Sequence, residues 1–274
     1  MLKDITLGQY FPGKSFIHKM DSRMKIIITM LYIIMLFTAN NIVSLFGATA
    51  LLFLFYIVAK IPVKMITKSL KPVMPIIVFT ALLNMLFMGG EPIFEIDFIK
   101  ITELGILMAV LMCVRIVALI AGTSLLTYTT SPIALTDAIE ALLKPLNKIN
   151  VPVHELAMMM TIALRFIPTL IEETEKIMNA QKARGADMET GGLMQRARAL
   201  VPILIPLFVS AFRRADELAL AMECRCYRGG EGRTRMKQLK MSSRDGVALV
   251  FMIVLFAAVL AGNVQAVRMG MPTL

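Results

Sequence analysis

Five long apolar stretches alternate with polar or charged segments along the chain, at residues 26–39, 42–59, 73–88, 104–128 and 247–267. A helix that spans the hydrocarbon core of a bilayer needs about 20 apolar residues, with a range of about 17–25. The stretches 26–39 and 73–88 are shorter, so we expect these helices to extend into their flanks or to lie where the bilayer is thin. The pattern predicts an all-α polytopic membrane protein with about five transmembrane helices.

The segment 129–245 has a different pattern. Apolar residues recur at helical spacing over 155–183 with charged residues on the other faces, and Pro168 is expected to bend this helix. Residues 200–212 are strongly apolar but contain two prolines, and two arginines follow them. We interpret both stretches as long amphipathic helices on the cytoplasmic side, under or against the membrane bundle. The alternative is that one of them forms a sixth span.

Basic residues are concentrated on alternate connections between the spans. Residues 1–25 hold five, 60–71 hold four and 129–245 hold 17 of the 29, whereas the loop 89–103 holds one against four acids. Lys and Arg accumulate on the cytoplasmic side of membrane proteins. We therefore predict that the N-terminus, the segment 60–71 and the segment 129–245 are cytoplasmic, and that the loop 89–103 and the C-terminus lie outside.

The composition agrees with this organisation. The chain is 57% hydrophobic and only 18% charged, with a mean hydropathy of +0.73. Topology accounts for the net charge of +10, so we expect the lipid bilayer and no nucleic acid as a partner. Three parts are predicted: 1–128 with a cytoplasmic N-terminal segment and four spans, the cytoplasmic region 129–245, and 246–274 with the final span.

No set of residues indicates catalysis or metal binding. Residues 8–15, GQYFPGKS, match the phosphate-binding pattern G-x-x-x-x-G-K-S, but that loop needs a preceding buried strand and only seven residues precede Gly8. We interpret it as a cytoplasmic turn. His154 lacks the second histidine of a zinc protease helix, and Cys224 and Cys226 have no third ligand nearby. We expect no enzyme activity, no catalytic residues, no metal and no cofactor.

A weak repeat occurs within the segment 129–245. Residues 180–186 align with residues 221–227 at an offset of 41, and each copy follows a long amphipathic helix. The centres are Ala183-Arg184-Gly185 and Cys224-Arg225-Cys226, in which an arginine lies between two small residues. Each copy precedes a pair of glycines, Gly191-Gly192 or Gly229-Gly230.

With these two motifs, the chain resembles the T component of energy-coupling factor transporters, the prokaryotic importers of vitamins and metals. The resemblance covers nearly the whole chain and includes GQYFPGKS at 8–15, DSRMK at 21–25, LTYTTSP at 126–132 and ALRFIP at 163–168. The family has two Ala-Arg-Gly triplets at the ends of cytoplasmic coupling helices. Here the first triplet matches fully, and the second keeps Arg225 between two cysteines.

The resemblance implies a coupling subunit in a prokaryotic cell membrane. Two ABC-type ATPase subunits would each receive one coupling helix, and a separate small membrane subunit would bind the substrate. The ATPase-coupling residues would be Ala183, Arg184, Gly185, Cys224, Arg225 and Cys226. From the residues alone, two interpretations of the arginines stay open: an anchor in a groove of a partner, or a solvated arginine favoured by the helix dipole.

Two further arginines are candidates for a supporting role. Arg115 lies near the middle of the fourth span, where a charge is costly and should face protein or a wet cavity. It either takes part in coupling or forms a structural hydrogen bond, for example to Thr123 or Tyr128. Arg165 either pairs with an acid such as Glu172 or Asp216, or contacts lipid headgroups.

Three other functions predict different sequence features. A stand-alone permease that lines its own substrate path predicts polar residues in several spans, and these spans are almost wholly apolar. A membrane-embedded enzyme predicts clustered acids, histidines or a metal motif. A membrane anchor or sensor without ATPase partners is disfavoured only by the two arginine motifs.

Overall fold

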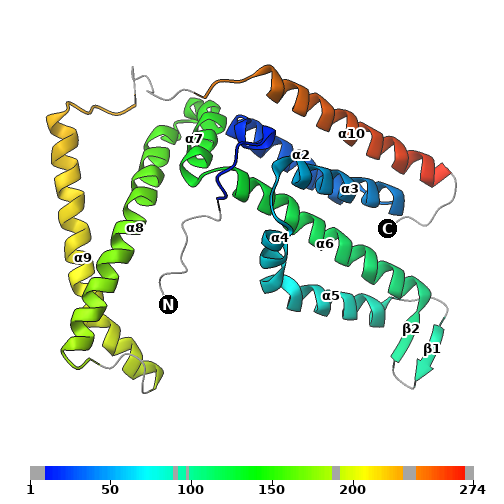
Figure 1. The fold of residues 1–274 in the computed structure, drawn as a ribbon, viewed down its shortest axis with the longest axis horizontal. Helices are drawn as coiled ribbons and strands as arrows, with labels where there is room; N and C mark the ends of the chain where they lie inside the picture. The colour runs from blue at the N-terminus through cyan, green and yellow to red at the C-terminus, as the bar shows by residue number, and fades with distance from the viewer. Residues whose placement is uncertain (1–9, 89–91, 97–98, 187–191, 231–238, 269–274) are drawn as a thin grey trace. The chain divides into compact units, whose positions relative to one another are not determined.

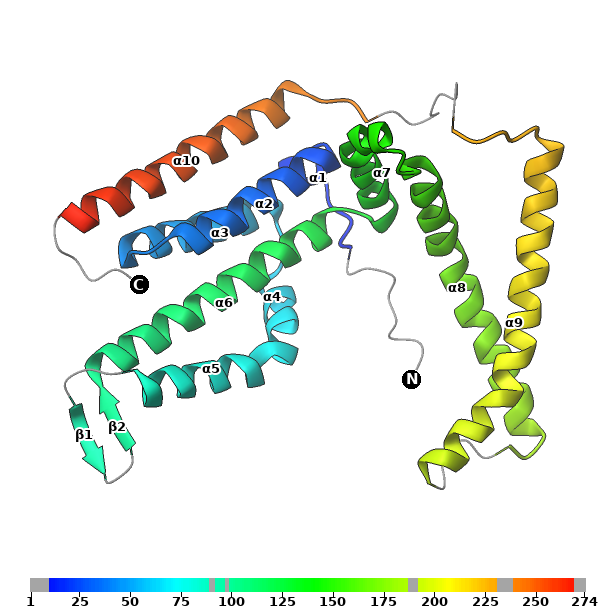
Figure 2. The ribbon, with the colours of Figure 1, turned by 180° about the vertical axis from the view of Figure 1, so that it is seen from behind.

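The computed structural model describes residues 10–88, 92–96, 99–186, 192–230 and 239–268. The described chain forms two units, of which one comprises residues 10–138 with 239–268 and the other residues 139–230 (Figures 1 and 2). We refer to them as the membrane unit and the hairpin unit. The helix α7 (Pro132–Leu143) begins in the first and ends in the second.

The membrane unit is built from helices of very different length. Its elements are α1 (Phe16–Lys19), α2 (Ser22–Thr38), α3 (Ile42–Ala59), α4 (Val63–Leu70), η2 (Lys71–Val73), α5 (Met74–Phe87), β1 (Pro92–Ile96), β2 (Ile99–Thr102), α6 (Glu103–Thr129) and α10 (Ser243–Arg268). The longest of the first six helices, α6, packs against α2, α3, α4 and α5. It is therefore the central helix of this unit (Figure 2).

The core of the membrane unit lies between α2, α3, α6 and α10. Leu36, Leu45 and Met252 are fully buried there. Three buried tyrosines donate their hydroxyl groups to backbone carbonyls, as in Tyr56 to Ala121 (2.8 Å) and Tyr128 to Met65 (2.9 Å). Such bonds are needed because a buried hydroxyl without a partner is costly. The core thus combines close apolar packing with satisfied polar groups.

Five helices of the described chain are long and apolar enough to cross a membrane. They are Ile42–Ala59, Val63–Phe87, Glu103–Thr129, Val153–Ala183 and Ser243–Gln265. The all-α class with about five such helices is therefore confirmed, with one addition. A short antiparallel hairpin, β1 paired with β2, precedes α6, and the apolar pattern did not predict it.

This set differs from the predicted spans in two members. The first predicted span, 26–39, corresponds to α2, which has 17 residues and is not among the five. The helix over residues 153–183, which we interpreted as amphipathic and cytoplasmic, is among them by length and composition. The predicted extension of the short stretches is confirmed, because α2 begins at Ser22 and the third apolar helix begins at Val63 and passes through η2.

The hairpin unit consists mainly of two long antiparallel helices, α8 (Val153–Ala183) and α9 (Leu193–Cys224), preceded by η3 (Lys144–Ile149). Gln181 Nε2 lies 3.5 Å from the carbonyl of Pro202, and Glu173 pairs with Arg214 at 2.7 Å. Ser210 also donates a hydrogen bond to Glu173. Both helices continue through their prolines. Figure 1 shows that α9 is bent toward its N-terminal end, and Pro202 and Pro206 belong to the N-terminal half of this helix.

Candidate functional site

The first arginine motif forms the end of α8. Ala183 is the last helical residue, Arg184 is the C-cap, and Gly185 has the left-handed backbone with φ of +87°. The N–H of Gly185 bonds to the carbonyl of Lys182 (3.0 Å), and the N–H of Ala186 bonds to that of Gln181 (3.0 Å). This pair of bonds is a Schellman motif, which satisfies carbonyls that the helix end leaves without partners.

The second arginine motif has the same geometry. Cys224 ends α9, Arg225 is the C-cap, and Cys226 has the left-handed backbone with φ of +54°. The N–H of Cys226 bonds to the carbonyl of Glu223 (2.8 Å), and the N–H of Tyr227 bonds to that of Met222 (3.0 Å). The 41-residue repeat is therefore also a repeat of backbone structure. Cysteine replaces glycine at a position that L-residues adopt only with strain.

Both arginines are accessible. Arg184 and Arg225 are exposed, as are the small residues on either side of each. Within the described ranges neither guanidinium forms an ion pair with another residue. Each side chain is thus available to a partner, and small neighbours allow a partner surface to approach the helix end closely.

The two motifs lie far apart on the hairpin unit. Gln181 lies beside Pro202, so Arg184 is near the start of the straight part of α9, whereas Arg225 follows the end of that helix. About 25 helical residues separate these levels, which corresponds to roughly 35 Å at 1.5 Å per residue. The antiparallel pairing therefore presents two sites of matching backbone geometry at opposite ends of one pair of helices.

The glycine pair after Arg225 packs against the start of α8. A Cβ on Gly230 would lie 2.4 Å from Cδ2 of His154, so the ring leaves no room for a side chain. Gly229 has φ of +89°, which also favours glycine. His154 Nδ1 lies 3.1 Å from Glu140 Oε1. The sequence reasoning missed this role of His154, because only a possible metal site was considered there. Gly191, of the other glycine pair, lies outside the described residues.

The two candidate supporting arginines have different surroundings, and the structural hydrogen bond expected as one alternative for Arg115 is present with another acceptor. Arg115 Nη2 donates to the carbonyl of Ala39 (2.6 Å), the C-cap of α2, and not to Thr123 or Tyr128. The cationic side chain thus stabilises the negative end of a short helix. Arg165 is exposed, and no ion pair joins it to Glu172, Asp216 or any other residue that the structure describes.

The segment that matches the phosphate-binding pattern forms a turn. Gly8 and Gln9 lie outside the described residues, and the rest leads into α1, which has only four residues. The carbonyl of Phe11 lies 3.0 Å from His18 Nε2, and a Cβ on Gly13 would lie 2.6 Å from the same ring. Burial by the protein lowers the pKa of His18. The glycine therefore makes room for His18, and no strand precedes it in the described chain.

The described residues bring no three His, Cys, Asp or Glu side chains together in a group that could hold a metal ion. The cysteines 113, 224 and 226 are free thiols.

Comparison with known proteins extends over most of the chain. Residues 13–236 match the family CbiQ, described as "Cobalt transport protein". Curated proteins named "Energy-coupling factor transporter transmembrane protein EcfT" are also similar. The protein from Clostridium kluyveri is 57% identical, with 93% of this chain and 95% of the relative covered. The one from Ruminiclostridium cellulolyticum is 54% identical over 92% and 96%, and the one from Bacillus subtilis is 48% identical over 94% and 97%. The chain therefore belongs to the CbiQ family, together with the transmembrane proteins EcfT of energy-coupling factor transporters.

Proposed function

We propose that this chain is the transmembrane coupling subunit of an ATP-driven energy-coupling factor importer of vitamins or other micronutrients. Its relatives carry the name of that component, and the described helices are apolar enough to cross a membrane several times. In this function the chain binds neither ATP nor the substrate. It transmits the closure of two ABC-type ATPase subunits to a separate small membrane subunit that binds the substrate.

The observation that carries the proposal is the matched geometry of the two arginine motifs. Arg184 and Arg225 are both exposed C-cap residues of Schellman motifs, and they lie at opposite ends of one antiparallel pair of helices. One site for each of two ATPase chains fits this arrangement. A guanidinium keeps its charge, offers five donors in a planar fork, and can bind a carboxylate with two hydrogen bonds. In this proposal, one ATPase subunit binds at each end of the α8–α9 pair.

The membrane orientation is part of the proposal. The N-terminus, the segment 60–71 and the segment 129–245 are placed on the cytoplasmic side, and the hairpin before α6 and the C-terminus outside. Support comes from the distribution of basic residues along the sequence. The division of the chain into 1–128, 129–245 and 246–274 by membrane side stays a prediction.

A stand-alone permease is the alternative function. It would line its own path with polar groups, but the candidate spans α3 and α10 are strongly apolar. In α5 and α6, threonine side chains bond to nearby backbone, as Thr80 bonds to Ile76 and Thr123 to Leu119. The hydroxyl groups of these threonines already have hydrogen-bond partners within their own helices, so they are not free to bind a solute.

Co-purification tests the proposed function directly. The tagged chain is extracted gently from native membranes, and the proteins that remain bound are identified by mass spectrometry. We expect two ATPase chains and at least one small membrane protein. The double variant Arg184→Glu/Arg225→Glu should lose the ATPases, because truncating a buried interfacial charge costs about 2–5 kcal/mol and reversing it also adds repulsion.

A matched control separates these sites from the general charge of the unit. Lys176 and Arg213 are exposed basic residues of the same hairpin unit that lie within α8 and α9, at least seven residues before the helix ends that carry the two motifs. Lys176→Glu/Arg213→Glu makes the same change in net charge and should retain the ATPases. Equal retention in both double variants would refute the arginine anchors. Recovery of the wild-type chain alone, still active in uptake, would establish the permease instead.

A further inference from the structure

A buried polar cluster surrounds the N-terminal end of α2. Asp245 is only 1% exposed and accepts hydrogen bonds from the backbone N–H of Asp21 (3.2 Å) and of Ser242 (2.8 Å). Arg23 Nη2 donates both to Asp21 Oδ2 (2.8 Å) and to the carbonyl of Leu239 (3.1 Å). The first turn of α2 is thereby attached to the segment that leads into α10.

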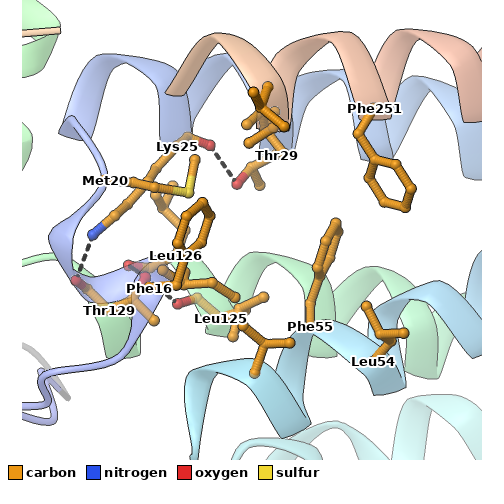
Figure 3. Close-up of a pocket in the computed structure, with 15 residues that line it drawn as sticks. Phe16, Met20, Lys25, Thr29, Leu54, Phe55, Leu125, Leu126, Thr129 and Phe251 are labelled. Carbon is orange, nitrogen blue, oxygen red and sulfur yellow. Dashed lines mark hydrogen bonds between the residues drawn. The ribbon is translucent and has the colours of Figure 1, made fainter. Parts of the chain in front are cut away.

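Lys25 attaches the same turn to two other helices. Its Nζ donates to the carbonyl of Thr129 at 2.8 Å, as Figure 3 shows, and to the carbonyl of His18 at 3.3 Å. Thr129 is the last residue of α6, where a cation is favoured by the helix dipole. We call the six residues Asp21, Arg23, Lys25, Thr129, Leu239 and Asp245 the α2 junction. It combines two of the segments noted in the sequence, 21–25 and 126–132.

The carboxylate of Asp21 is held in its charged form. Burial by itself raises the pKa of Asp21, but the hydrogen bonds and the positive charge of Arg23 outweigh that effect and keep the pKa below its usual value. Hydrogen bonds between charged groups are stronger than those between neutral groups. Asp21 therefore stays charged at neutral pH and keeps its bonds to Arg23.

The α2 junction contains residues from both chain segments that connect the described parts of the two units. The chain leaves the membrane unit through α7, which begins at Pro132, just after Thr129. It comes back from the hairpin unit immediately before Leu239. Among the described residues, the outgoing and the returning connections between the two units are thus bonded to one helical turn, by Lys25 on the outgoing side and by Arg23 on the returning side.

Apolar packing alone holds the start of α10 weakly. An apolar pocket of about 270 Å³ lies between α1, α2, α3, α6 and α10, and Val247 and Phe251 line it (Figure 3). Met252 of α10 is fully buried, but the residues between it and Asp245 include the exposed side chains of Val247 and Val250. At the far end Asn263 accepts a hydrogen bond from Asn41 (3.2 Å). With a pocket between these two attachments, the direction in which α10 starts depends strongly on Asp245.

We propose that the α2 junction transmits the movement of the hairpin unit to α2 and α10, with Arg23 and Asp245 as positioning residues. This inference rests on the proposed function, in which ATPases move the hairpin unit. When either connection moves, the hydrogen bonds of Arg23 and Lys25 transmit that movement to α2. The hydrogen bond between Asp21 and Asp245 then transmits it to α10. The junction takes no part in ATPase binding, because its members lie outside both arginine motifs.

Hydrogen–deuterium exchange of the complete complex tests this relay without knowledge of the substrate. The complex of the full chain with its co-purified ATPases is compared without nucleotide and with Mg-ATP plus orthovanadate. In the wild type we expect nucleotide to change amide exchange in α8 and α9 and also in α2 and the first turns of α10. In Asp245→Asn and in Arg23→Gln the change in α8 and α9 should remain, and the change in α2 and α10 should be lost.

Arg244→Gln is the matched control, because Arg244 is exposed and adjacent to Asp245. It should behave like the wild type. If Asp245→Asn does not yield folded protein, Arg23→Lys serves in its place. It keeps a charge beside Asp21, but one ammonium cannot reproduce the contacts of two guanidinium nitrogens with Asp21 and Leu239.

Three results would overturn the relay. The first is a wild-type-sized change in α2 and α10 of the junction variants. The second is a wild-type complex in which nucleotide affects α8 and α9 but neither α2 nor α10. The third is loss of the ATPases from the junction variants, which would assign the junction to assembly. Failure of the proposed function is recognised separately, because the wild-type chain would then purify without ATPases.

Discussion

At the scale of single residues, the second arginine motif keeps its backbone shape without the glycine that usually allows it. Cys226 has φ of +54°, close to the left-handed region that Gly185 occupies in the first motif. The hydrogen bonds of the helix end are the same in both. The hydrogen bonds of the Schellman motif therefore determine the left-handed backbone at this position, and Cys226 adopts it with strain.

Replacing Cys226 with glycine should stabilise the end of α9. A left-handed backbone costs a non-glycine residue about 1–2 kcal/mol, and the greater freedom of glycine in the unfolded chain offsets about 0.4–1 kcal/mol of the gain. We expect Cys226→Gly to raise the thermal unfolding midpoint of the detergent-purified chain slightly. The matched change Gly185→Ala should lower it. A lower midpoint for Cys226→Gly would show that the thiol makes a contact that matters more than the strain.

Arg115 shows how a costly charge in an apolar helix becomes part of the structure. Its Nη2 reaches the C-cap carbonyl of Ala39, which the end of α2 leaves without a helical partner. The bond lies partway along α6 because α2 has only 17 residues and α6 has 27. A structural role therefore accounts for Arg115, and a role in coupling is not needed to explain it.

At the scale of elements, the hairpin unit is held together by polar contacts as much as by apolar packing. Glu173 on α8 receives bonds from both Arg214 and Ser210 on α9. Many apolar residues of α9 are exposed, among them Ile205, Phe208 and Phe212. Helices with exposed apolar stripes and a charged pairing between them are typical of elements that pack against partners.

The contact between the loop after α9 and the start of α8 should be sensitive to a single methyl group. Gly230→Ala would place Cβ 2.4 Å from the ring of His154, so the loop or the ring must move. Overpacking of this kind costs about 1–3 kcal/mol. We expect a lower unfolding midpoint and faster amide exchange in residues 225–230.

Two further variants test whether contact with the His154 ring causes the effect of Gly230→Ala. Gly192 has open space around it, so Gly192→Ala should have little effect. Combining Gly230→Ala with His154→Ala should restore the exchange rates, because the clash is removed. Unchanged exchange in Gly230→Ala would mean that the loop is not held by this contact.

At the scale of the whole molecule, the proposed orientation can be tested with the native thiols. Cys224 and Cys226 are exposed on the hairpin unit, which is proposed to be cytoplasmic, whereas Cys113 lies within α6. A membrane-impermeant maleimide should therefore not label Cys224 or Cys226 in intact cells and should label both once the cells are permeabilised and the bound ATPases are removed. Glu95→Cys, in the β1–β2 hairpin that is proposed to lie outside the cell, should be labelled in intact cells. Labelling of Cys224 before permeabilisation would reverse the orientation.

Much of this protein follows from the sequence by itself, because membrane insertion depends on local composition. Runs of apolar residues predict the helices that cross a bilayer, and the placement of Lys and Arg predicts their orientation. The two arginine motifs were found from a 41-residue spacing, and both lie at helix ends in the structure. The outline of the fold and the candidate site were therefore predictable from short-range patterns.

Other features were decided only by the tertiary structure, because they depend on contacts between residues far apart in the chain. Asp245 meets Asp21 across 224 residues, and Arg23 meets Leu239 across 216. The partner of Arg115 and the close approach of Gly230 to His154 depend on helix lengths and on packing. No local pattern predicts such pairs, because a side chain that ends in a charge can bond to any carbonyl or carboxylate that the fold brings near.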